Sequence, residues 1–182
     1  ALEAAGIRTV GPRELLFDRA AAEQAIADIR ASGPIDLLLI LQITFTDATM
    51  TVKLAKEATT PIAIWAVPEP RSGGRLRLNA YCGLNLAAHA LGRAGVPHGW
   101  LYAAPDAPDL SSSLRALATP AAAVPTRARP VPAAADTSAE RVLDSMSGAK
   151  ITVVGQHPDG FDTCEYDDDL LFNLAGLRVE TV

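Results

Sequence analysis

The sequence has few of the residues that characterise several classes of protein. Only two of its 182 residues are cysteines, Cys82 and Cys164, which is too few for a metal knuckle or a disulfide framework. It has no apolar run of the roughly 20 residues that a membrane-spanning helix needs. Positive charge is not in excess either, since the formal net charge is −5. We therefore expect neither a membrane span nor a nucleic-acid partner.

Aromatic residues are also scarce, at 5% of the chain, whereas hydrophobic residues make up 49%. Alanine, leucine and valine must therefore fill the core, as they do in layered folds of helices and strands. The first residues lack the basic stretch and apolar core of a signal peptide. We expect a reduced, cytoplasmic protein in which both thiols are free and buried.

Strand-like apolar runs alternate with helix-like segments in the first part of the chain. We expect strands over residues 7–10, 35–41, 61–66 and 99–102, and helices over 19–31, 47–58 and 79–94. Continuous apolar runs of strand length are typical of parallel strands buried on both faces. This order predicts an α/β fold: a Rossmann-like parallel sheet with right-handed crossovers and helices on both faces.

The composition changes after this first part, and we divide the chain into three regions. Residues 1–103 form an amino-terminal α/β domain, and residues 104–147 form a linker rich in proline and alanine, with a short helix over 138–147. Residues 148–182 begin a second α/β domain, which is truncated. The chain starts at Ala1 and stops inside an apparent strand, so we expect a fragment of a longer protein.

Two loops that follow expected strands carry the polar groups most suited to binding. In open α/β sheets, ligands bind beside the carboxyl ends of strands. The loop at residues 42–47 offers amide and hydroxyl groups that suit sugar hydroxyls, and Thr46 and Asp47 equally suit a plain cap of the next helix. The loop at residues 68–75 places Arg71 and Arg75 on either side of two glycines, an arrangement that suits an anion or a solvated turn.

Metal-binding and catalytic patterns are weak. His89 stands alone in an expected helix and is interpreted as structural. His157, Asp159 and Asp162 lie in one loop that could coordinate a cation, but Pro158 and Gly160 also suit a plain turn. The acidic residues 167–169 suit a solvated helix start. We find no nucleophile elbow and no HExxH motif, and we assign no catalytic or metal residue to this chain.

Several ordered motifs resemble one enzyme family. Residues 41–50, 64–79 and 82–91 resemble the amino-terminal domain of L-fucose/L-arabinose isomerase-like proteins. Residues 154–164 resemble the opening strand and loop of that family's middle domain. The resemblance implies an aldose–ketose isomerase, an intramolecular oxidoreductase that works through an enediol and uses a divalent metal, usually manganese.

The resemblance also implies what this part of such an enzyme does. The catalytic acids and metal ligands of the family lie in later parts, so this fragment alone is expected to be inactive. The amino-terminal domain reaches into the active site of a neighbour in a homo-oligomer. The residues expected to line the neighbour's sugar pocket are Gln42, Ile43, Thr44 and Phe45, with Arg71 and Arg75 at its rim.

Two alternatives remain open from the residues themselves. The chain could be a non-catalytic sugar-binding module used for sensing, because loops at strand ends also suit that role. It could also be an assembly domain that only holds an oligomer together. The sequence leaves open which sugar is bound and how many subunits assemble.

Overall fold

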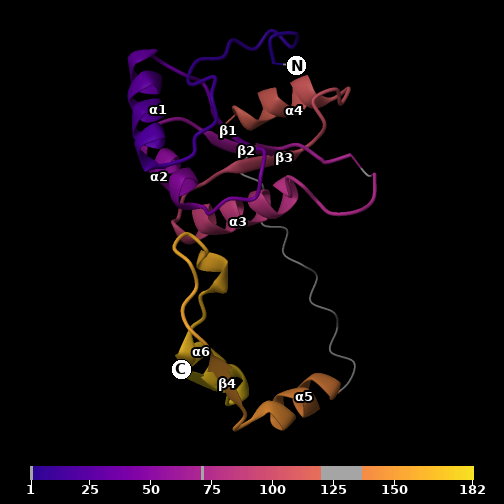
Figure 1. The fold of residues 1–182 in the computed structure, drawn as a ribbon. Helices are drawn as coiled ribbons and strands as arrows, with labels where there is room; N and C mark the ends of the chain where they lie inside the picture. Colours follow the sequence, from indigo (N-terminus) through magenta and orange to yellow (C-terminus); the bar gives the residue numbers. More distant parts are fainter. Residues whose placement is uncertain (1, 71, 120–136) are drawn as a thin grey trace. The chain divides into compact units, whose positions relative to one another are not determined.

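The computed structural model describes residues 2–70, 72–119 and 137–182 (Figure 1). The chain divides into two compact units, Ala1–Pro125 and Thr126–Val182. Both units combine helices with parallel strands, so the α/β class expected from the sequence is confirmed. No helix in the described ranges combines the length and apolarity needed to cross a membrane.

The first unit is built on a three-stranded parallel sheet of β1 (Leu38–Gln42), β2 (Ile62–Ala66) and β3 (Gly99–Tyr102), in that order. Ala66 pairs with Gln42 on one side and with Tyr102 on the other. The carboxyl ends of the three strands therefore form one row. Every residue of the central strand β2 is buried, as its continuous apolar sequence predicts.

Helices cover both faces of this sheet. α2 (Thr49–Glu57) connects β1 to β2, and α3 (Ala80–Arg93) connects β2 to β3. Because the sheet grows in one direction, right-handed crossovers place both helices on the same face. α1 (Arg19–Ala31) packs beside α2, and α4 (Leu110–Leu117) lies across the other face (Figure 1).

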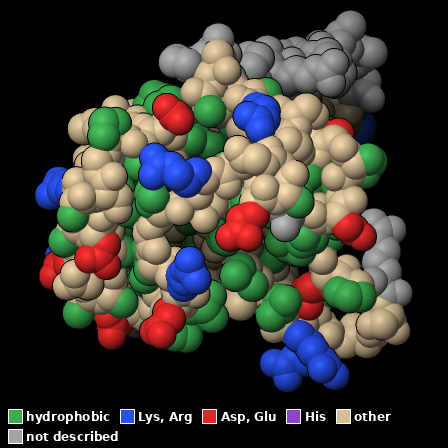
Figure 2. Space-filling model, turned by 90° about the horizontal axis from the view of Figure 1, so that it is seen from above, with side chains coloured by type: hydrophobic (Ala, Val, Ile, Leu, Met, Phe, Trp, Pro, Cys, Tyr) green, Lys and Arg blue, Asp and Glu red, His purple; other side chains and the backbone are tan. Residues whose placement is uncertain are grey.

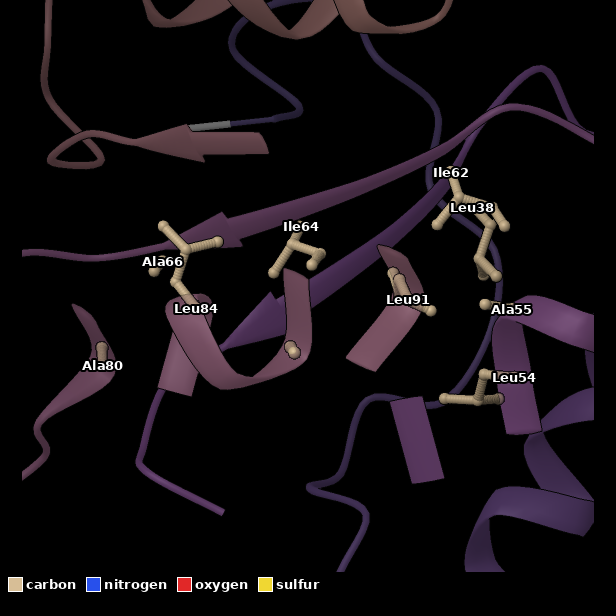
Figure 3. Close-up of a cluster of buried hydrophobic side chains, with 10 residues drawn as sticks. Leu38, Leu54, Ala55, Ile62, Ile64, Ala66, Ala80, Leu84 and Leu91 are labelled. Atoms are coloured by element: carbon tan, nitrogen blue, oxygen red, sulfur yellow. The ribbon is translucent and has the colours of Figure 1, made fainter. Parts of the chain in front are cut away.

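The main core lies between the sheet and α2 and α3. Ile64 of β2 and Leu91 of α3 are its largest fully buried side chains. Figure 3 shows Ile64, in the middle of β2, pointing from the sheet toward α3, and Leu38, at the start of β1, close to Ala55 of α2. These apolar contacts hold the crossover helices to the sheet.

A second cluster lies on the opposite face. Trp65 of β2, which is 4% exposed, packs with Leu110 and Leu114 of α4. Its indole nitrogen donates a hydrogen bond to the carbonyl oxygen of Ala103, 2.9 Å away. The indole thus buries its ring and still satisfies its only donor, which is the usual arrangement for a buried tryptophan.

The second unit contains α5 (Ser138–Met146), β4 (Lys150–Val153), a short 3-10 turn η2 (Asp162–Cys164), α6 (Asp168–Ala175) and β5 (Arg178–Thr181). β4 and β5 are parallel, and α6 connects them. The Asp167 carboxylate accepts a hydrogen bond from the amide of Leu170, so it caps α6, whose first turn carries two further acidic residues.

The structure differs from the sequence-based expectation at four places. Residues 7–10 form no strand. Ile7 packs against the cluster around Trp65 instead of joining the sheet. Residues 104–119, expected to belong to a linker, carry α4, which lies in the first unit. The remaining part of that expected linker up to residue 136 lies outside the described residues.

The third difference concerns the thiols, which were expected to be buried. Both Cys82 and Cys164 are exposed. Cys82 lies in α3, whose buried side is taken by Ala80, Gly83 and Leu84 among others, so its own position faces solvent. His89 on the same helix is exposed too, and not packed as we expected for a structural histidine.

Candidate functional site

The loops that follow β1 and β2 meet at the carboxyl edge of the sheet. We call residues 43–48, between β1 and α2, the β1 loop, and residues 67–79, between β2 and α3, the β2 loop. Both loops start from paired residues, because Gln42 and Ala66 are register partners. The amide of Phe45 donates a hydrogen bond to the carbonyl oxygen of Leu78, 2.8 Å away. The β1 loop therefore lies beside the end of the β2 loop, and an approach of residues 68–75 to the β1 loop stays a prediction.

Gln42 organises the β1 loop from inside. Gln42 is the last residue of β1 and is only 6% exposed. Its amide nitrogen lies 2.6 Å from the carbonyl oxygen of Thr44 and 3.3 Å from the hydroxyl of Thr46. The amide thus donates to the loop itself. A contact between Gln42 and a sugar stays a prediction.

Helix α3 approaches the β1 loop without an intervening side chain. A Cβ atom at Gly83 would lie 2.5 Å from the backbone carbonyl oxygen of Thr44 and 2.8 Å from the side-chain nitrogen Nε2 of Gln42. Real Cβ atoms do not come that close to other atoms. Only glycine fits at this position of α3 without a shift of its neighbours. The glycine thus lets the helix pack directly against the β1 loop.

The β2 loop is closed by Glu69, which sequence analysis did not single out. Its carboxylate accepts hydrogen bonds from the amides of Arg77 and Leu78, both at 2.8 Å, and of Asn79 at 2.7 Å. The bonds from Leu78 and Asn79, followed by that from Arg77, lower the pKa of Glu69 from its ordinary value, against a smaller rise from desolvation. In the sequence, the only feature that marks Glu69 for closing the loop is its position between two prolines.

The end of the β2 loop passes directly into α3. Asn79 adopts a left-handed conformation, with φ of 55°, and its carbonyl oxygen accepts a hydrogen bond from the amide of Gly83 in the first turn of the helix. The carboxylate of Glu69 therefore lies near the positive end of the α3 dipole. One acidic side chain ties together the first part of the loop, its last part and the start of the helix.

Asp47 supports the start of α2 from the position before the N-cap residue Ala48, which itself makes no side-chain cap bond. Its carboxylate accepts a hydrogen bond from the amide of Thr49, the first residue of α2, at 2.9 Å. The Thr46 hydroxyl bonds within the loop, to the backbone of Asp47 and to the amide of Gln42. The polar groups of residues 46 and 47 thus serve local structure.

The remaining predicted site residues differ in exposure. Ile43 and Thr44 are half-buried, whereas Phe45 is 42% exposed at the edge. Arg75 is exposed, and Arg71 lies outside the described residues. The structure brings the β1 loop and the end of the β2 loop together, and a role in binding for any of these side chains stays a prediction.

An aromatic pair at the same edge was missed by sequence analysis. The rings of Tyr81 and Tyr102 lie 4.9 Å apart, tilted by 59°, and both residues are exposed. Tyr102 ends β3 in register with Ala66, and Tyr81 lies in the first turn of α3. The sequence feature that could have indicated this pair is Tyr102 at the carboxyl end of an expected strand. Exposed aromatic rings at a strand edge suit the apolar face of a polar ligand.

No group of three or more histidine, cysteine, aspartate or glutamate residues that could hold a metal occurs within residues 2–70, 72–119 and 137–182. The His157 ring lies 3.1 Å from the carbonyl oxygen of Pro158. The side chain of Asp162 is not described.

Acidic and basic side chains are interspersed on the face of the molecule shown in Figure 2.

A hollow of about 360 Å³ lies at the opposite, amino-terminal end of the strands. Ile35 and Leu38 line it beside Leu54 of α2. Its walls also include Arg30 and Glu57, which form an ion pair with each other. Because its charged groups are paired and it lies away from the loops, we place the candidate site at the carboxyl edge.

Residues 2–126 match the family described as "Fucose/sulfoquinovose isomerase, N-terminal domain". A sulfoquinovose isomerase of Alkalicoccus urumqiensis is 28% identical over 174 residues, which cover 94% of this chain and 34% of that protein. A sulfoquinovose isomerase of Priestia aryabhattai is 30% identical over 156 residues, covering 86% and 31%. The chain thus spans about a third of the length of these relatives. These matches agree with the resemblance found in the sequence motifs.

Proposed function

Because this chain belongs to the fucose/sulfoquinovose isomerase family, matching its N-terminal domain, we propose that it is the amino-terminal part of an aldose–ketose isomerase. The observation that carries the proposal is the match over residues 2–126 in a chain whose two polar loops are joined at the carboxyl edge of the sheet. The expected substrate is a sugar of the fucose or sulfoquinovose type.

The proposed contribution of this chain is to complete a sugar pocket built mainly by other parts of the enzyme. The β1 loop would enter the pocket of a neighbouring subunit in a homo-oligomer. The exposed ring of Phe45 suits the apolar face of a sugar, and the half-buried Thr44 beside it carries a hydroxyl that suits sugar hydroxyls. The organisation by Gln42, Gly83 and Glu69 supports this proposal, since a loop fixed before binding loses less entropy on binding.

Two finer points of architecture belong to the same proposal. The first unit would form the core of a Rossmann-like domain, and the unit Thr126–Val182 would begin a second α/β domain. The helix α6 between the parallel strands β4 and β5 supports the second point, because such a βαβ unit is the building block of α/β domains.

A divalent metal such as Mn²⁺ is proposed for the whole enzyme, where it would polarise the sugar oxygens. The described residues of this chain offer no cluster of metal ligands, so they do not fit that role themselves. The residues of the carboxyl edge would act by positioning the sugar and by excluding water.

The test uses the protein encoded by the complete reading frame, assayed with Mn²⁺ for isomerisation of fucose and of sulfoquinovose. Turnover of either sugar is expected. Phe45→Ala is expected to raise KM about tenfold, because the ring loses its packing on the sugar. Phe17→Ala is the matched control, since Phe17 is 80% exposed and lies before α1.

Three results would count against the proposal. Absence of turnover with both sugars would remove the isomerase assignment, and binding of a sugar without turnover would favour the sensing module. An unchanged KM in Phe45→Ala, together with a loss of oligomer measured by light scattering, would favour an assembly domain.

A further inference from the structure

The β2 loop is a cationic segment in an acidic protein. Residues 67–79 contain three arginines and one acidic residue, whereas the whole chain has a formal charge of −5. Between Glu57 and Asp106, Glu69 is the only acidic residue in the sequence. Arg75 and Arg77 are both exposed. Within the ranges that the structure describes, neither guanidinium forms an ion pair with a carboxylate.

The acidic residue of the loop does not neutralise these arginines. Both oxygens of the Glu69 carboxylate are bonded to backbone amides, including that of Arg77 itself. The carboxylate of Glu69 thereby supplies the negative charge next to the positive end of the α3 dipole. The free positive charge of the loop therefore resides on its guanidinium groups.

The same hydrogen bonds hold the backbone of the segment at Arg77 in place. The amide of Arg77 is held by Glu69, and the carbonyl oxygen of the next residue, Leu78, accepts the hydrogen bond from Phe45. The arginine-bearing segment therefore adjoins the β1 loop at the candidate site. A charge carried by an anchored backbone can favour one ligand geometry, whereas a charge on a flexible loop cannot.

We propose that Arg75 and Arg77 form an anion subsite that binds the sulfonate group of a sulfonated hexose. This inference rests on the proposed function and specifies its substrate class. Guanidinium groups suit sulfonate oxygens because they present several N–H donors in one plane and stay charged at every physiological pH. A neutral sugar such as fucose would leave both arginines without a counter-charge.

The test uses the complete enzyme with two sugars that differ in the sulfonate alone, sulfoquinovose and its sulfonate-free parent quinovose. Arg75→Ala and Arg77→Ala are each expected to raise KM for sulfoquinovose about tenfold. KM for quinovose should stay unchanged in both variants. Arg75→Lys is expected to recover part of the loss, since lysine keeps the charge but lacks the planar fork.

Arg30→Ala is the matched control. It removes the same charge at the end of α1, beside the hollow at the opposite end of the strands, and should leave both KM values as they are. Rising ionic strength should increase KM for sulfoquinovose in the wild type and much less in the Arg75→Ala and Arg77→Ala variants. Circular dichroism of each variant verifies that the fold is retained.

The outcomes separate the two proposals. Turnover of sulfoquinovose with the same KM in the wild type, Arg75→Ala and Arg77→Ala overturns the anion subsite and leaves the isomerase assignment standing. Equal rises in KM for both sugars also overturn it, because the arginines would then act without regard to the sulfonate. If neither fucose nor a sulfonated sugar is turned over, both proposals fall together.

Discussion

Gly83 of α3 lies so close to Thr44 that a methyl group on its Cα would stand 2.5 Å from the carbonyl oxygen of that residue. This contact joins a helix that follows β2 to a loop that follows β1. Backbone lies against backbone here, so an added side-chain atom fits only if the helix or the loop moves. The candidate site therefore depends on a residue that has no side chain to contribute.

Gly83→Ala is expected to destabilise the protein by about 1–3 kcal/mol, the usual cost of overpacking a close contact. The neighbours that would have to give way include backbone, which relaxes less easily than a flexible side chain. Chemical denaturation of the wild type and the variant measures the difference.

Gly92→Ala is the matched control in the same helix. A Cβ there meets nothing within 4 Å, so alanine should stabilise the protein by about 0.5–1 kcal/mol through its better helix propensity. If both substitutions changed stability by the same amount and in the same direction, the close approach at Gly83 would be unimportant.

Gln42→Ala is expected to cost about 1–3 kcal/mol, because it leaves the partly buried carbonyl oxygen of Thr44 without its donor. Thr46→Ala loses only the longer contact at 3.3 Å and should cost much less. The measurement is denaturation together with the amide shifts of residues 43–46 in NMR spectra. A Gln42→Ala protein that kept full stability and the wild-type shifts would contradict the role of Gln42 as the organiser of the β1 loop.

The closure of the β2 loop is expected to depend on pH through Glu69. Its pKa is lowered in the folded state, so the carboxylate contributes stability above the ordinary value of 4.5, and that contribution is lost as the pH falls through the folded pKa. The amides of Leu78 and Asn79 should therefore shift in NMR spectra at a pH below 4.5.

Glu69→Gln keeps an acceptor oxygen but lacks the charge, so it should weaken the closure without this titration. Glu69→Ala should release residues 70–78 at every pH. Identical acid titrations of the Leu78 amide in the wild type and in Glu69→Gln would rule out the carboxylate as the cause.

Asn79 offers a further test, because among the described residues it is the one residue other than glycine with a positive φ. Asn79→Ala should cost about 1 kcal/mol, since a left-handed backbone crowds the Cβ atom of alanine, whereas Asn79→Gly should change stability by about 0.5 kcal/mol or less. Thermal unfolding of both variants provides the comparison. Equal melting temperatures would contradict a conformational role for residue 79.

The sequence predicted those features of the fold that depend on continuous local patterns. The run at residues 61–66 identified the buried strand β2, and the segment at 79–94 identified α3. The run at 35–41 identified β1 but placed its start too early, because pairing begins at Leu38, whose amide bonds to the carbonyl oxygen of Pro61. Ile7–Val10 has a strand-like composition, yet its apolar residue Ile7 is accommodated by packing on the cluster of Trp65.

The candidate site was only partly predictable. Its location followed from the rule that parallel strands end at one edge, because that rule needs only the positions of the strands. The partners within it did not follow, since Glu69 reaches amides eight to ten residues away and Gly83 meets a loop that follows a different strand. Such contacts depend on the angle at which the loops leave the sheet, and no local pattern encodes that angle.

The central position of β2 also has a consequence for how the protein is made. On the ribosome, β1 is synthesised first but can form no sheet until residues 62–66 have emerged, and β3 completes the sheet only after Tyr102. A nascent chain therefore holds the apolar strand β1 without its partner while α2 and β2 are still being translated. We expect this interval to be the stage at which the growing chain most needs a chaperone.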